Sequence, residues 1–378
     1  MVNGEKVSSE ELVVSSDFVA SQRDLTNQSS DNSTQKTPHS SLLTPNFSKP
    51  LFVFLNVYKP TGMTSHDVIA ALRKITKIKQ IGHTGTLDPF AQGVLSVAIG
   101  KATRLIEYLD DEKEYLAEIS FGKSTDTYDC DGRATCESGL KVAQKEIIEG
   151  LKTFEGEIMQ TPPIYSALKV KGKKLYEYAR QGQEVEIEAR KVFIEKIELQ
   201  EFDEKNQKAQ VLIKCSKGTY IRSIAHDLGQ KLGCGAYLSK LVRTQAGKFF
   251  IKDAVLLEDI KTIEDVEKNL INPLNVINLP QIEINEEEYK KVLMGQAILV
   301  SSEELVVRSD FVASQRDLTN QSSNNSIPTT PHSSLLTPNY KNASLSVILV
   351  YNKSISAIAQ VNGNQINVRM VFLLKMKF

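Results

Sequence analysis

One acidic residue, Asp88, lies in a loop whose composition would hold its carboxylate in a fixed position. Residues 81–95 contain three glycines, one histidine, two threonines and the pair Asp88-Pro89. Glycine reaches backbone angles that other residues avoid, and a proline moves the residue before it into an extended conformation. An Asx turn, which a single Asp-Pro pair supports, is the simpler alternative. The concentration of special residues favours a carboxylate that is presented for chemistry.

The loop resembles the catalytic motif of the bacterial tRNA pseudouridine-55 synthases of the TruB type. The match covers residues 82–89 and 91–95, and five further blocks are arranged in the order of that family. Six ordered blocks between about residues 51 and 260 argue against an accidental match. The five further blocks are residues 59–65, 121–132, 165–169, 175–182 and 216–222.

The resemblance implies an enzyme that isomerises uridine 55 in the T-loop of tRNA to pseudouridine after flipping the nucleotide out. The reaction breaks the C1′–N1 glycosidic bond and joins C1′ to C5, without oxidation, reduction or hydrolysis. We therefore expect no cofactor and no metal. A nucleophilic carboxylate is needed, and the resemblance gives this role to Asp88. Attack at C6 of the base, attack at C1′ of the sugar, and a glycal intermediate all remain open.

The resemblance also assigns the residues around the target base. Burial disfavours the charged form of a carboxylate, so Asp88 needs a cationic partner, and the matching residue is Arg222. The alternative is that Arg222 contacts phosphate or solvent on a basic helix. Tyr115 matches the tyrosine that stacks on the target base and is a candidate general base. Tyr220 matches a second pocket tyrosine, and Leu241 matches an apolar wall of the uracil site.

Contacts with RNA outside the uracil pocket are expected from a histidine and from basic residues. In the family, the residue matching His83 occupies the space that the extruded base leaves, although a loop histidine is more often structural or exposed. Residues 163–182 carry five Lys or Arg against one acid and resemble the flexible thumb that closes on an RNA loop. The candidate contacts with the RNA backbone are Lys169, Lys171, Lys173, Lys217 and Arg243.

The composition fits an RNA-binding protein of the cytoplasm. Formal net charge is zero, but residues 205–248 contain nine Lys or Arg against one acid, and local basic patches govern phosphate binding. The four cysteines are scattered without the spacing of a zinc site, as in a reducing compartment. The N-terminus lacks the pattern of a secretory signal, and no apolar run could span a bilayer. We expect a monomer.

The expected elements alternate irregularly between helix and strand, which favours an α+β fold over repeated βαβ units. The resemblance specifies the pseudouridine-synthase fold over residues 51–276, with a mixed, largely antiparallel sheet and flanking helices. Hydrophobic spacing predicts strands at 52–57, 114–121, 192–199 and 209–215. It predicts helices at 65–76, 103–109, 142–154, 173–180 and 220–232.

Two segments outside this domain, residues 8–46 and 301–339, are near-copies, with 34 of 39 aligned positions identical. They are rich in Ser, Thr, Asn and Gln, and such segments usually stay flexible, although a short helix fits residues 10–21 and 303–314. Copies separated by a whole domain cannot stack as a solenoid. We expect a mobile sequence inserted twice; a duplicated binding peptide is the alternative.

The first copy would lie in a flexible N-terminal extension, residues 1–50. The second would interrupt a small β-rich domain, residues 277–300 and 340–378, that resembles an RNA-binding PUA module. Alternating apolar residues and Asn362-Gly363 predict a hairpin leading into a strand at 366–372.

Two other functions compete with the isomerase. A non-catalytic tRNA-binding or tRNA-folding module would keep the basic patches, but it would not need Asp88, Tyr115, Tyr220 and Arg222 together. A phosphoryl-transfer enzyme with an aspartyl nucleophile would need a second acid for magnesium and a phosphate cradle, and the loop has neither.

Overall fold

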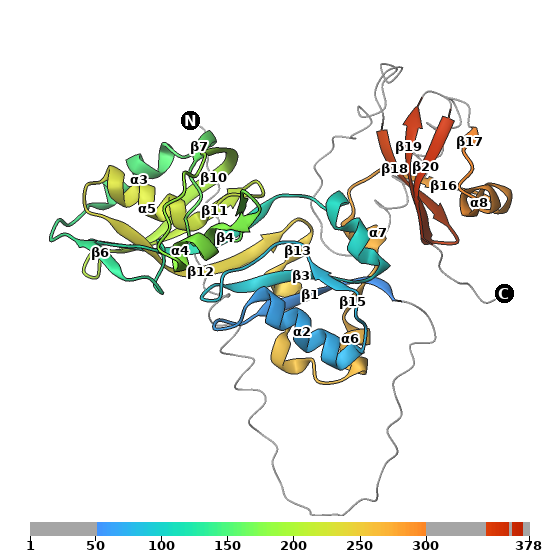
Figure 1. Cartoon of the computed structure of the whole chain (residues 1–378), viewed down its shortest axis with the longest axis horizontal. Coiled ribbons are helices and arrows are strands. Elements are labelled where there is room, and N and C mark those ends of the chain that lie inside the picture. Colours follow the sequence, from blue (N-terminus) through green and yellow to red (C-terminus); the bar gives the residue numbers. More distant parts are fainter. Residues whose placement is uncertain (1–50, 300–344, 363–364, 373–378) are drawn as a thin grey trace, which may run out of the picture.

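The computed structural model describes residues 51–299, 345–362 and 365–372. Both near-copies, and the short helices expected within them, lie outside these residues. The described part is an α+β fold with one eleven-stranded sheet and a separate five-stranded sheet near the C-terminus (Figure 1). None of the helices in these three ranges is long and apolar enough to cross a membrane.

The large sheet is mixed and mostly antiparallel, as predicted. Its central path runs β14 (Val255–Leu256), β1 (Phe52–Lys59), β3 (Gln92–Gly100), β12 (Ala236–Ala246), β4 (Lys113–Phe121), β11 (Lys208–Cys215), β10 (Arg190–Asp203) and β7 (Gly156–Gln160). β2 (Ile81–His83) pairs with β3, β13 (Phe249–Phe250) with β12, and β15 (Leu270–Ile271) with β1. Only the β1–β14 and β12–β3 pairs on the central path are parallel.

Helix α2 (Ser65–Thr76) has the predicted limits. A capping box between Thr64 and Asp67 begins it, and Lys77 in the left-handed conformation ends it. The helix expected at 103–109 is the 3₁₀ helix η1 (Lys101–Tyr108). The other helices of the large domain are α3 (Gln144–Lys152), α4 (Leu175–Arg180), α5 (Ile221–Lys231), η2 (Ile251–Asp253), η3 (Leu257–Asp259), α6 (Ile263–Lys268) and α7 (Pro273–Val276).

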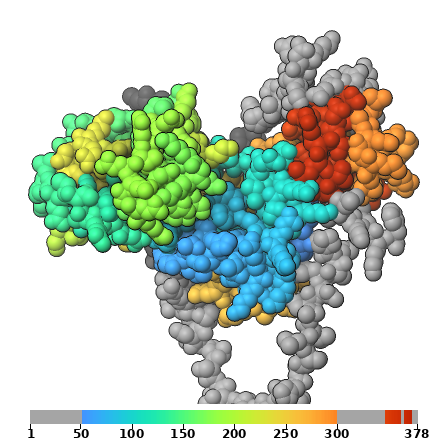
Figure 2. Space-filling view, in the orientation of Figure 1, coloured from blue at the N-terminus to red at the C-terminus, as the bar shows by residue number. Residues whose placement is uncertain are grey.

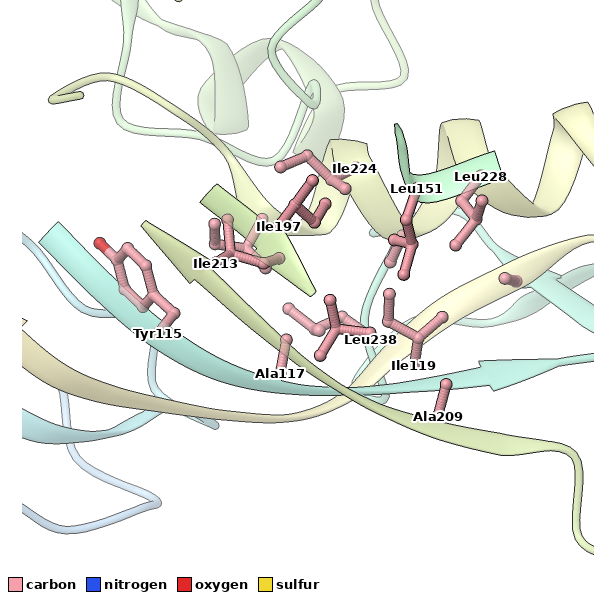
Figure 3. Close-up of a cluster of buried hydrophobic side chains, with 14 of the residues drawn as sticks. Tyr115, Ala117, Ile119, Leu151, Ile197, Ala209, Ile213, Ile224, Leu228 and Leu238 are labelled. Carbon is pink, nitrogen blue, oxygen red and sulfur yellow. The ribbon is translucent and has the colours of Figure 1, made fainter. Parts of the chain in front are cut away.

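Helices cover the two halves of the large sheet separately. In one half, α3 and α5 pack on β4, β10, β11 and β12 around a core drawn in Figure 3, where Leu151, Ile224 and Leu228 face Ile119 and Leu238. In the other half, α2 and α6 pack on β1 and β3. The two halves meet where β3 pairs with β12.

The five-stranded sheet has the order β16 (Gln281–Glu283), β18 (Leu345–Tyr351), β19 (Ser354–Asn362), β20 (Gln365–Val371) and β17 (Ile298–Leu299), with α8 (Glu286–Leu293) before β17. The expected hairpin strands, β19 and β20, are present; the turn residue Gly363 lies outside the described residues. The rings of Phe52 and Phe372, 4.8 Å apart, lie in a core that both sheets share.

Candidate active site

Asp88 lies in the loop between β2 and β3, and the main chain on either side of it is fixed by α2 and its preceding turn. Leu87 N donates to Ser65 Oγ at 2.8 Å, and that hydroxyl donates back to Leu87 O at 3.1 Å. Gly62 N donates to Pro89 O at 2.8 Å. The block at 59–65 therefore holds both neighbours of Asp88.

Lys59, the last residue of β1, reinforces this arrangement from a fully buried position. Its Nζ donates to Pro60 O at 2.8 Å, Met63 O at 2.6 Å and Pro89 O at 3.4 Å. Burial lowers the pKa of Lys59 to about 8, although the nearby charge of Asp88 opposes the shift.

Arg222, in the first turn of α5, binds Asp88 with two nitrogens. Its Nε lies 2.9 Å from Asp88 Oδ2 and its Nη2 lies 3.2 Å from Asp88 Oδ1. The arginine side chain is 5% exposed, whereas that of the aspartate is 33% exposed. A two-pronged charge-assisted contact fixes the orientation of the carboxylate. The structure thus brings together the two residues that the sequence paired, and Arg222 does not face solvent.

A second carboxylate, Asp129, completes the surroundings of Arg222. Its Oδ2 lies 3.2 Å from Arg222 Nη1, which also donates to Thr127 O at 3.2 Å. Burial raises the pKa of Asp129, while the Thr127 hydroxyl, 2.5 Å from Oδ1, and the charge of Arg222 oppose that rise. Arg222 Nη2 donates to Tyr165 O at 3.1 Å. Three segments of the chain, at Asp88, at residues 127–129 and at Tyr165, converge on the guanidinium of Arg222.

The sequence analysis did not select Asp129, although it lies in the matched block at 121–132. Two other acids, Asp126 and Asp131, lie in that block, and only the fold shows which of the three reaches α5. The sequence signal that could have selected Asp129 is its position two residues after Thr127, whose hydroxyl binds it.

An aromatic side chain of β4 and an apolar side chain of β12 lie in the core that also contains Leu87 and Ala91 of the Asp88 loop. Tyr115 on β4 is 7% exposed and Leu241 on β12 is 6% exposed. Burial raises the pKa of Tyr115, whereas the charge of Arg243 and a hydrogen bond from it act in the opposite direction. Figure 3 shows the Tyr115 hydroxyl at one end of the buried cluster, directed away from it.

Comparison with known proteins gives consistent matches. Residues 73–221 match the TruB family pseudouridylate synthase (N terminal domain), and residues 222–277 match the tRNA pseudouridylate synthase B C-terminal domain. The tRNA pseudouridine synthase B of Carboxydothermus hydrogenoformans is 47% identical over 255 residues, which cover 66% of this chain and 86% of that protein. The chain belongs to the TruB family.

A second relative and a solved structure agree with this assignment. The tRNA pseudouridine synthase B of Caldanaerobacter subterraneus subsp. tengcongensis is 48% identical over 249 residues, covering 65% of this chain and 85% of that protein. A chain in a crystal structure of a Cbf5-Nop10-Gar1 complex has a TM-score of 0.57 and 25% identity, with 86% of each chain covered. This TruB-family protein is therefore a pseudouridine synthase, an isomerase.

One predicted RNA contact of this TruB-family synthase is wrong. Arg243 is fully buried, so its guanidinium cannot reach a phosphate on the surface. Its Nε donates to Val94 O at 2.7 Å and its Nη2 to Gly85 O at 3.1 Å. The charge of Arg243 predicted an RNA contact, but its side chain turns into the protein and binds main-chain carbonyls around the loop of Asp88.

Tyr220 and His83 lie at the ends of elements that lead into the site. Tyr220 directly precedes α5, where its N and O pair with the side chain of Gln160 at 2.8 and 3.0 Å. This pairing fixes the start of the helix that carries Arg222. His83 is the last residue of β2 and half-buried; burial, followed by the charge of Arg243, lowers its pKa.

The remaining predicted RNA contacts lie at or near the surface. Lys169 and Lys171 are exposed in a hairpin of β8 (Lys169–Val170) and β9 (Lys173–Lys174), which leads into α4. Lys173 is half-buried, with its Nζ 4.5 Å from the centre of the Tyr178 ring. Lys217 pairs with Asp111 at 2.5 Å. In Figure 2 the green surface that includes this part of the chain faces the viewer and borders the blue surface.

The arrangement can perform nucleophilic chemistry on an aromatic base. A partly exposed carboxylate is held by a buried guanidinium, and a tyrosine and a leucine are buried on the neighbouring strands β4 and β12. Within the three described ranges, no group of three or more His, Cys, Asp or Glu could hold a metal ion.

Proposed function

We propose that this pseudouridine synthase converts uridine 55 in the T-loop of tRNA to pseudouridine, with Asp88 as the nucleophile. The observation that carries the proposal is the pairing of a 33% exposed Asp88 with a 5% exposed Arg222. A carboxylate that is accessible on one side and bound by an arginine on the other can attack a bound base or sugar. The curated relatives described above are tRNA pseudouridine synthases B, which supports tRNA as the substrate.

The chemistry requires a base that has left its stack, because neither C6 nor C1′ is open to attack inside a folded T-loop. In the proposed complex Tyr115 stacks on the uracil, and Leu241 and Tyr220 complete its pocket. His83 takes the place of the extruded base. Lys169, Lys171, Lys173 and Lys217 bind phosphates as residues 163–182 close on the RNA.

The bonds balance without an external reactant, which supports a reaction without metal or cofactor. The C1′–N1 bond breaks, the C1′–C5 bond forms, the proton on C5 leaves, and N1 gains a proton. A monomer in the cytoplasm is sufficient for this reaction on tRNA.

Asp88→Asn tests the nucleophile directly. The amide keeps the shape of the side chain but not its nucleophilicity, so we expect no tritium release from tRNA labelled at C5 of uridine. Affinity for tRNA, measured by filter binding, should stay within about twofold because phosphate contacts dominate it. Asp253→Asn, at an exposed carboxylate in η2, is the matched control and should turn over normally. Product from Asp88→Asn would exclude Asp88 as nucleophile.

Arg222→Lys in the same assay separates the isomerase from a tRNA-binding module that does not catalyse. A lysine cannot reproduce the two-pronged contact with Asp88, so single-turnover rates at saturating enzyme should fall by about 100-fold or more with little change in affinity. Weaker binding with normal saturated turnover would instead indicate a phosphate contact. An inactive wild-type protein that binds tRNA tightly would favour the binding module.

A further inference from the structure

The buried guanidinium of Arg243 binds the catalytic loop at both ends. At the N-terminal end it donates to Gly85 O at 3.1 Å and to Thr86 O at 3.5 Å. At the C-terminal end it donates to Val94 O at 2.7 Å. Asp88 lies between these acceptors in the sequence, so one side chain closes the loop that carries it.

The main chain of Arg243 touches the same loop. β12 and β3 run parallel here, with Arg243 beside Gly93 in the register. Gly93 has a φ of +104°, and a Cβ on it would lie 2.3 Å from Arg243 O. The loop therefore meets Arg243 at a contact that only glycine permits.

Arg243 also faces the residue expected to stack on the base. It lies opposite Tyr115 in the antiparallel β12–β4 pair. Burial raises the pKa of Tyr115, and the charge of Arg243 and its hydrogen bond to the phenol counteract that rise. One residue thus contacts both the loop that bears Asp88 and the side chain of Tyr115.

A contribution to stability alone does not explain why the buried side chain at position 243 is charged. The acceptors on the loop are neutral carbonyls, so dipoles rather than an opposite charge stabilise the buried cation, and desolvating a charge is costly. Its charge also contributes to lowering the pKa of Lys59 and His83, two other residues beside the loop. Only arginine offers a planar fork with donors for several carbonyls at once.

We propose that Arg243 is a positioning residue for the isomerisation, which fixes the loop of Asp88 at both ends and orients Tyr115 beside it. The proposal rests on Asp88 as the nucleophile. Arg243 acts through these two residues and does not itself touch the RNA.

Arg243→Lys and Arg243→Gln test the proposal, with Thr244→Val as the control. Thr244 is the next residue of β12 and bonds Glu114 on the other face of the sheet. Lysine keeps the charge without the fork, and glutamine removes the charge. Because a misplacement of about 1 Å can cost about 100-fold in rate, we expect single-turnover rates of both variants to fall by about that factor. Affinity for tRNA should change by less than about twofold.

The pH profile separates positioning from general structural damage. Loss of the cation in Arg243→Gln should move the part of the pH profile that reports the ionisation of Tyr115 to higher pH, whereas Arg243→Lys should leave it at the wild-type position. Thr244→Val should have the wild-type rate and profile. Normal rates in both Arg243 variants would overturn the proposal, and so would a loss of tRNA affinity at a normal saturated rate.

A second substitution keeps the test open if the Arg243 variants fail to fold. In Gly85→Ala the added Cβ would lie 3.6 Å from Arg243 Nη1 and 3.2 Å from Lys113 Cε, so only a flexible side chain must shift. We expect a fall of several-fold in single-turnover rate without loss of affinity. Gly139→Ala, where a Cβ meets open space, is the control. An unchanged rate in Gly85→Ala would count against positioning.

The two proposals fail separately. If Asp88→Asn forms product, Asp88 is not the nucleophile, whatever the Arg243 variants show. If Asp88→Asn is inactive but the Arg243 variants are fully active, only the positioning role of Arg243 is excluded.

Discussion

The fully buried ammonium of Lys59 makes stability depend on pH in a range where exposed lysines stay charged. Its pKa is about 8 in the folded protein, against 10.5 for the free side chain, and burial is the main cause. Its bonds to Pro60 O, Met63 O and Pro89 O hold the turn beside Asp88. The residue contributes to the geometry of the site while its burial opposes folding at neutral pH.

Lys59→Met should remove this dependence. Between about pH 8 and 10.5 the unfolded chain binds the proton that folded Lys59 has lost, so the unfolding free energy rises with pH. The largest slope for one group is about 1.4 kcal/mol per pH unit. Subtracting the curve of Lys59→Met from that of the wild type, both from urea unfolding, cancels the other lysines and tyrosines. We expect a flat difference below pH 8 and a rise above it; a flat difference throughout would mean that Lys59 stays protonated.

The segment between β5 (Lys123–Thr125) and β6 (Ala134–Glu137) delivers Thr127 O and Asp129 to Arg222, and Tyr128 secures it to α5. The ring of Tyr128 stacks on His226 with centroids 3.8 Å apart and planes 14° apart. His226 follows Arg222 by one helical turn. Tyr128 has a φ of +64°, which costs a residue with a Cβ about 1 kcal/mol.

His226→Ala and Tyr128→Gly should therefore differ, although both remove the stack. An aromatic pair contributes about 1 kcal/mol, so His226→Ala should lower the unfolding free energy by about that amount. Glycine loses the same contact but relieves the positive φ, so Tyr128→Gly should be close to neutral. Urea unfolding at neutral pH measures both, with Lys231→Ala at the exposed end of α5 as the control. Equal destabilisation by the two variants would show that the positive φ carries no cost.

Local patterns predicted the elements better than the contacts between them. Thr64, Asp67 and the apolar spacing of residues 65–76 define α2 within the sequence, and its limits were predicted correctly. The parallel neighbours β3 and β12 were not predicted, because their pairing joins residues about 150 positions apart. That pairing is what places Arg243 under the loop.

The residues of the candidate site likewise fall into those that the sequence predicted and those that only the fold revealed. Asp88 stands out through its glycines and proline, which act locally, and the resemblance supplied Arg222. The roles of Asp129 and Arg243 depend on the direction of their side chains. Asp129 lies in the segment after β5, and Arg243 lies on β12. Charge alone predicted an RNA contact for Arg243, and burial shows the opposite.

At the scale of the whole molecule, the C-terminal sheet is assembled from strands on both sides of residues 301–339. β17 ends at Leu299, which pairs with Gln365, and β18 begins at Leu345, which pairs with Val361. Since Asn362 pairs with Gln365, Leu299 and Leu345 lie at the same end of the strands of this sheet. Residues 301–339 lie outside the described structure, and their duplicate at 8–46 precedes the catalytic domain.

Deleting residues 301–339 should leave the sheet and the turnover intact. β18 and β17 are three spacings apart in the sheet, or about 14 Å. The six residues left between Leu299 and Leu345 can span about 23 Å, so the shortened connection reaches without strain. A loop shortened from 45 residues to six also loses less entropy on folding, by about 2 kcal/mol if the loop is flexible.

We expect a small rise in melting temperature and tRNA turnover within about twofold of wild type, with a deletion of residues 8–46 as the control. If the protein without residues 301–339 stays folded but loses turnover, while the control keeps it, the second copy has a function in catalysis that its composition does not indicate.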